Sequence, residues 1–168
     1  MEPLRFRPES ELRQEARRAF TAHSKLVSGL VPEAEIVHIG ATAIEGSLTK
    51  GDVDLLLRVP GEAFSAAVEA LGSSYAIHQP ENWTPTFASF KQQPSGGIPV
   101  GIQVAVKGSE EDATFLALLQ LMRSRPQLVE EYNAIKREHE GGDEKAYLET
   151  KAAFFERLRP EIEASPPS

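Results

Sequence analysis

The sequence predicts an α+β fold in which a mixed β-sheet is flanked by helices and followed by a C-terminal helical segment. Three observations lead to this fold class. Residues 10–30 carry apolar side chains three and four positions apart, the spacing of one helical face. Short apolar runs separated by turn residues follow between residues 34 and 106, as expected for four or five strands. From Ser109 onward the apolar spacing is again helical, in three segments.

The strand predictions rest on apolar runs that end at turn residues. The run from Val53 to Val59 suits a strand buried on both faces, with Asp54 as an anomaly, and Pro60-Gly61 ends it. The strands are expected at residues 34–39, 53–59, 75–78, 82–91 (a strand or a hairpin arm) and 100–106.

The helix predictions rest on amphipathic spacing and on capping residues. A helix is expected at residues 62–71, and three more in the C-terminal third. Ser109 with Asp112 three residues later has the pattern of a capping box. Pro126 suits the first turn of the next helix, and Asp143 can cap the last one after the pair Gly141-Gly142.

Length and charge limit the classes of function. The 168 residues predict one domain at residues 1–164 with a frayed tail at 165–168. Eighteen basic and 25 acidic residues give a net charge of −7, which argues against nonspecific binding to nucleic acid. The absence of cysteine excludes a disulfide, a thiol nucleophile and Cys-ligated zinc. Without a membrane-spanning apolar run or a secretory h-region, we expect a cytoplasmic protein with no membrane partner.

Two carboxylates near the second predicted strand have the pattern of a metal site. Asp52 and Asp54 are two residues apart, so on a strand both side chains point to the same face. Two such charges repel each other unless a cation lies between them or one takes a proton. Carboxylate oxygens suit Mg²⁺, which completes its shell with water and substrate phosphates.

A turn of small residues precedes these carboxylates. The backbone N–H groups of Gly40, Ala41 and Thr42 can hold a phosphate, and Lys50 adds a positive charge nearby. A structural interpretation stays open, in which residues 50–52 form a hairpin turn and Lys50 is a surface lysine. We favour the metal and phosphate site because the glycine turn lies upstream of the two carboxylates.

The pattern Ile39-Gly40-Ala41, followed by Asp52-Val53-Asp54, resembles the signature of the nucleotidyltransferase superfamily. The wider chain resembles the GrpB family, a small branch of that superfamily, roughly from residue 37 to residue 158. The segments that carry this resemblance are His38-Ile39-Gly40-Ala41-Thr42, Gly46, Lys50, Ile102-Gln103-Val104, Gly108-Ser109-Glu110, Tyr132-Asn133-Ala134-Ile135-Lys136, Tyr147 and Lys151.

The resemblance implies that Asp52 and Asp54 are catalytic and hold the metal, that the glycine turn holds the nucleotide phosphates, and that Lys151 reaches toward the bound anion. Full members have a third carboxylate on a later strand, where this chain has Gln103, which is no base. Ala41 replaces the usual serine or glycine, which removes a possible hydroxyl ligand.

Two hypotheses about function follow. The first is a Mg²⁺-dependent nucleotidyltransferase-like protein that transfers NMP from an NTP, a nucleoside triphosphate, to a small-molecule acceptor. The alternative is a catalytically degenerate protein that binds a nucleotide or a phosphorylated metabolite, for which Gln103 is the main support.

Overall fold

A five-stranded mixed sheet forms the centre of the structure, a computed structural model that describes residues 2–94 and 97–165. β4 runs parallel to β7, and all other neighbouring strands are antiparallel. In sheet order the strands are β2 (Glu35–Ile39), β4 (Val53–Val59), β7 (Val100–Val106), β6 (Phe87–Gln92) and β5 (Ala76–Ile77). The predicted α+β class with a mixed sheet is confirmed.

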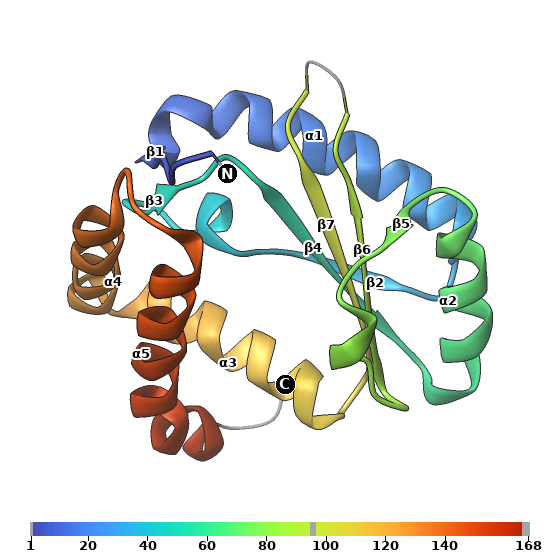
Figure 1. The fold of residues 1–168 in the computed structure, drawn as a ribbon. Helices are drawn as coiled ribbons and strands as arrows, with labels where there is room; N and C mark the ends of the chain where they lie inside the picture. Colours follow the sequence, from blue (N-terminus) through green and yellow to red (C-terminus); the bar gives the residue numbers. More distant parts are fainter. Residues whose placement is uncertain (1, 95–96, 166–168) are drawn as a thin grey trace.

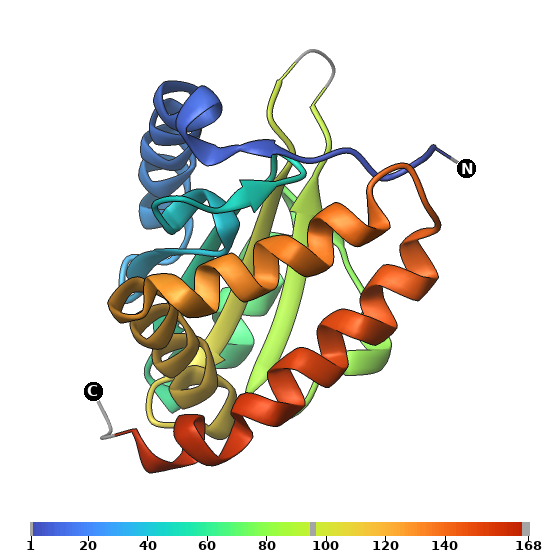
Figure 2. The same cartoon turned by 90° about the vertical axis from the view of Figure 1, so that its left-hand side faces the viewer.

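The helices cover the sheet on both faces (Figures 1 and 2). α1 (Glu9–Leu30) and α2 (Phe64–Gly72) pack on one face, and α3 (Glu110–Ser124), α4 (Pro126–His139) and α5 (Glu144–Ala164) pack on the other. Pro126 lies in the first turn of α4, and the side chain of Asp143 caps α5, both as predicted. Within the described part of the chain, no helix is long and apolar enough to cross a bilayer.

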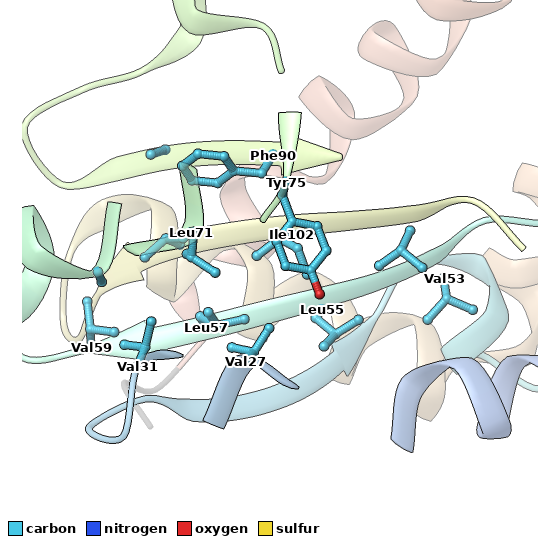
Figure 3. Packing of buried hydrophobic residues seen from close by; sticks show 14 of the residues in the cluster. Val27, Val31, Val53, Leu55, Leu57, Val59, Leu71, Tyr75, Phe90 and Ile102 are labelled. Atoms are coloured by element: carbon cyan, nitrogen blue, oxygen red, sulfur yellow. The ribbon is translucent and has the colours of Figure 1, made fainter. Parts of the chain in front are cut away.

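β4 contributes to two hydrophobic cores because its side chains alternate between the two faces. Leu55 and Leu57 point toward α1 and α2, where they pack with Val27, Leu71 and Ile102 (Figure 3). Leu56, between them, belongs to the core under α3, α4 and α5. By the same alternation, Asp54 lies on the face covered by these three helices.

The sheet margins differ from the prediction. β6 begins at Phe87 rather than at residue 82, because Pro80–Asn82 forms a 3-10 turn and Trp83 follows it outside the strand. The indole of Trp83 packs on Phe90 at 5.4 Å between ring centroids. A second, two-stranded sheet of β1 (Arg7–Pro8) and β3 (Leu48–Thr49) was not predicted, since two residues are too few to show a period.

The capping box predicted at the start of α3 forms only in part. The Asp112 N–H donates to Ser109 Oγ at 3.2 Å, as expected for the cap. The Asp112 carboxylate, however, accepts from Arg58 Nε at 2.7 Å and from Arg58 Nη2 at 3.0 Å. Arg58 is only 8% exposed on β4, so its guanidinium needs this partner. Of the predicted tail, Ser165 follows α5 and residues 166–168 lie outside the described residues.

Candidate active site

Asp52 and Asp54 lie at the start of β4 and line one cavity of about 480 Å³. Asp54 is the second residue of the strand, whereas Asp52 precedes it. Thr42 donates from Oγ1 to the Asp52 carbonyl at 3.1 Å, and this bond ties the glycine turn to the strand entry. The two carboxylates therefore face the same cavity although only one belongs to the strand.

Two glycines leave the space that the Asp54 carboxylate occupies. Gly40 has a φ of +81°, and a Cβ there would lie 2.6 Å from Asp54 Oδ2. Gly101 pairs with Asp54 across β4 and β7, and a Cβ there would come still closer to Asp54 Oδ1. Because any side chain at either position would displace the carboxylate, the backbone itself forms two walls around Asp54.

Neighbouring side chains compensate the negative charge of Asp54 only in part. Burial and the neighbouring Asp52 raise the pKa of Asp54 to about 6, although Lys151, a hydrogen bond from Gln103, and Lys50 act in the opposite direction. A cation between the carboxylates would remove this repulsion, so the pair fits Mg²⁺. The described residues contain no group of three or more His, Cys, Asp or Glu side chains able to hold a metal. Water and substrate oxygens would therefore complete the coordination shell.

Three lysines line the same cavity, from three different elements. Lys50 is exposed on the loop before β4, Lys136 comes from α4 and Lys151 from α5. Burial and Lys50 lower the pKa of Lys151, while Asp54 and Asp52 raise it in part. The three lysines outnumber the two carboxylates that line the cavity, which favours an anionic ligand.

Lys136 is more deeply enclosed than the other two lysines. It is 2% exposed, donates from Nζ to the Leu48 carbonyl at 2.6 Å, and has Nζ 3.9 Å from the centroid of the Tyr132 ring. Burial, Lys151 and Lys50 lower its pKa to about 7. Lys136 thus holds β3 as well as facing the cavity.

The loop between the glycine turn and β4 is fixed by α4 and α1. Asn133 donates from Nδ2 to the Gly46 carbonyl and accepts at Oδ1 from the Leu48 N–H, both at 2.9 Å. Glu9, at the start of α1, accepts from the Gly46 N–H at 3.2 Å and donates from its own N–H to the Ser47 carbonyl at 2.8 Å. The sequence did not predict that Asn133 and Glu9 hold this loop. The feature that could have indicated it is a polar side chain on an otherwise apolar helix face.

The predicted phosphate-binding residues do not all face the cavity in the same way. Gly40 and Ala41 line it. The Thr42 hydroxyl contacts His38 Nε2 at 3.0 Å and donates to the Asp52 carbonyl, so it positions Asp52. The phosphate contact predicted for Thr42 is through its backbone N–H and stays a prediction. His38 itself packs on the Phe20 ring, with 4.8 Å between the ring centroids.

Gln103 lies on β7 beside Asp54 and also lines the cavity. Its side chain donates a hydrogen bond to Asp54, while its Oε1 is buried without a partner among the described residues. The position predicted for a third carboxylate is therefore next to the carboxylate pair, but it holds an amide.

An apolar wall, which the sequence did not predict, completes the cavity. It comes mainly from α3, with one residue from α5 and Phe6 from the N-terminal segment. The Phe6 ring contacts the Tyr147 ring edge-on at 5.4 Å between centroids. The apolar wall consists of Phe6, Phe115, Leu118, Leu119, Met122 and Phe155.

Comparison with known proteins relates the whole chain to one family. The family model described as GrpB protein matches residues 9–161. A UPF0157 protein of Vibrio cholerae is 29% identical over 155 residues, which cover 92% of this chain and 81% of that protein. The crystal structure of the conserved protein GrpB from Enterococcus faecalis has a TM-score of 0.71 at 15% identity, over 88% of this chain and 92% of that chain.

More distant structural relatives are nucleotidyltransferase-like. The Cid1 poly(U) polymerase with bound MgGTP has a TM-score of 0.53 at 15% identity, over 78% of this chain but only 43% of that chain. At this level of identity the match concerns the fold alone. The sheet and helices described above are thus shared with a nucleotidyltransferase, as the sequence resemblance implied.

Proposed function

The chain belongs to the GrpB family, and from this premise we propose that it binds an NTP with Mg²⁺ and transfers NMP to a small-molecule acceptor. One observation carries the proposal. The Asp54 carboxylate is enclosed by the backbone at Gly40 and Gly101, beside Asp52, in a cavity with an excess of positive charge. A buried pair of carboxylates next to lysines suits a cation and a phosphate together.

The two carboxylates and the glycine turn have separate roles in this proposal. Asp52 and Asp54 would hold Mg²⁺, which when bound neutralises charge on the phosphates and polarises the reacting one. The backbone at Gly40 and Ala41 would lie along the phosphates, and Thr42 would keep Asp52 in place.

The lysines would bind and orient the phosphates. Lys151, with Lys136 behind it, would neutralise the charge that develops on the leaving pyrophosphate, and Lys50 would neutralise charge at the phosphate where transfer takes place. The α4 and α5 walls would exclude water from the reacting groups. The net charge of −7 and the cavity of about 480 Å³ favour a small acceptor over a polymer.

The test is thermal stability with ATP, GTP, CTP and UTP, each with and without Mg²⁺, for the wild type and Asp54→Asn. A ligand at one hundred times its Kd stabilises by about 2.7 kcal/mol, which corresponds to a rise in Tm of about 5–10 °C. We expect such a rise for at least one nucleotide with Mg²⁺ in the wild type and none in Asp54→Asn. Without nucleotide, the variant should be as stable as the wild type or more stable at neutral pH. Folding raises the pKa of Asp54, so the ionised carboxylate destabilises the folded state, and Asp54→Asn removes that charge.

Asp143→Asn serves as the matched control, since asparagine keeps the cap of α5 and Asp143 does not line the cavity. The control should retain the wild-type nucleotide shift. An equal shift in wild type and Asp54→Asn, or no shift with any nucleotide, would refute the proposal.

Gln103 favours a second candidate function, in which the same site binds a nucleotide or a phosphorylated metabolite without chemistry. The amide beside Asp54 cannot accept a proton from an acceptor hydroxyl. This candidate predicts the Mg²⁺-dependent nucleotide shift without pyrophosphate release in the presence of any acceptor. Pyrophosphate release therefore separates the two functions.

A further inference from the structure

The cavity has no carboxylate left to act as a general base. Under the proposed function, Asp52 and Asp54 hold the metal, and the next polar side chain on the sheet is Gln103. A hydroxyl acceptor must lose its proton when it attacks a phosphorus atom, and an amide cannot take that proton. Lys136 is engaged elsewhere, because its Nζ donates to the Leu48 carbonyl and lies over a tyrosine ring.

A second cavity of about 440 Å³ borders the first one. α1, β1 and the segment before β7 form its walls, and Lys50 lines both cavities. Its charged residues are Arg7, Arg18 and Lys50, with Glu15 as the one carboxylate, which leaves an excess of two positive charges. None of the ion pairs in residues 2–94 and 97–165 involves these three cationic side chains. We name this cavity the α1 groove.

We propose that the acceptor is a phosphomonoester, whose phosphate is drawn in by Arg7, Arg18 and Lys50 and supplies the attacking oxygen. This inference rests on the proposed function and names its acceptor. A phosphomonoester is already anionic at neutral pH, so its oxygen needs no base. A lone pair on that oxygen forms a bond to the α-phosphorus of the NTP. The bond from the α-phosphorus to the bridging oxygen breaks, and its electron pair leaves with pyrophosphate, so no proton has to move.

The position of Lys50 suits this assignment. Its side chain lies on the boundary between the α1 groove and the carboxylate cavity, one residue before Gly51 and two before Asp52. A phosphate in the α1 groove would therefore be next to the site of transfer. The pyrophosphate would leave on the other side, toward Lys151 on α5, as an in-line displacement requires.

The first experiment measures phosphate binding without nucleotide. The Tm of the protein is compared in sodium phosphate and in sodium chloride at equal ionic strength, for wild type, Arg18→Gln and Arg17→Gln. Both arginines are exposed neighbours on α1, but only Arg18 lines the α1 groove. We expect phosphate to raise the Tm of wild type and Arg17→Gln by about 3 °C or more and that of Arg18→Gln by less than about 1 °C. A shift that is equal in the two variants, or absent in the wild type, would overturn the assignment of the groove.

The second experiment identifies the nucleophile through pyrophosphate release with NTP and Mg²⁺. The acceptors are a defined pool of sugar, polyol and nucleoside monophosphates, and the same pool after phosphatase treatment and removal of the phosphatase. We expect release at least tenfold faster with the intact pool. The proposal that the phosphate is the nucleophile is overturned if pyrophosphate release is equal with both pools or faster with the treated pool. Absence of release with both pools counts as an equal result. Failure of the proposed function is seen separately, as loss of the Mg²⁺-dependent nucleotide shift while the phosphate shift remains.

Discussion

Replacement of Asn133 by alanine should loosen the loop that carries the candidate active site. Asn133 is 3% exposed on α4, and its amide satisfies the Gly46 carbonyl and the Leu48 N–H. Alanine would remove both hydrogen bonds and leave two backbone groups without these partners, one on the exposed Gly46 and one on the half-buried Leu48. The loop would then depend on Glu9, Lys136 and the pairing of β3 with β1.

The expected cost follows from these two bonds. A hydrogen bond whose partner remains accessible to water contributes about 0.5–1.5 kcal/mol net. For the two bonds we therefore expect a loss of about 1–3 kcal/mol in the free energy of unfolding. For a domain of this size, that loss corresponds to a fall in Tm of about 2–12 °C.

Urea unfolding followed by circular dichroism measures the free energy directly. Asn82→Ala is the matched control, because the Asn82 side chain is exposed and makes one long hydrogen bond of 3.5 Å to Gln79. The control should change the free energy of unfolding by less than about 0.5 kcal/mol. If Asn133→Ala had as small an effect as the control, Asn133 would not be what fixes the loop, and the site would have to be rigid for another reason.

Two further predictions concern stability and ligand binding. Burial raises the pKa of Asp112, but the hydrogen bonds from Arg58 and from a backbone N–H outweigh it and lower the pKa from its usual 3.8. This depressed pKa stabilises the fold above about pH 4 and ceases to do so as the pH falls through the folded value. Asp112→Asn should therefore cost about 3 kcal/mol in urea unfolding at pH 7 and progressively less below pH 4, and a pH-independent loss would contradict the ion-pair explanation. Gly101→Ala should fold yet lose the Mg²⁺-dependent nucleotide shift, since the added Cβ displaces Asp54, whereas Gly72→Ala, with no atom within 4 Å of its added Cβ, should keep the shift.

The parts of the fold that sequence could predict are those with a strong local period. β4 is buried on both faces and bounded by turn residues, so its apolar run defined it to the residue. Asp54 interrupts that run, and a charge where packing requires an apolar side chain is visible in sequence. α3, α4 and α5 were predictable from their caps and apolar spacing.

The remaining features depend on contacts between distant segments. Asn133 and Gly46 are 87 positions apart, and no local period relates them. Phe6 reaches the cavity only because β1 pairs with β3, a contact of two residues on each side. Asp112 has the spacing of a capping box, but its carboxylate meets Arg58 from a strand 54 positions away, and the buried guanidinium is the stronger partner.

The distribution of charge links the candidate acceptor to the rest of the surface. The chain carries a net charge of −7, yet both cavities have an excess of positive charge. At physiological ionic strength, the screening length of electrostatic interactions is about 8 Å. A small anion near Lys50 therefore interacts mainly with the lysines and arginines around it. A polyanion extends over many such lengths and meets the acidic surface as well. We therefore expect this arrangement to favour a phosphorylated small molecule over a long nucleic acid, which would separate the acceptor proposed here from the poly(U) named for the structural relative Cid1.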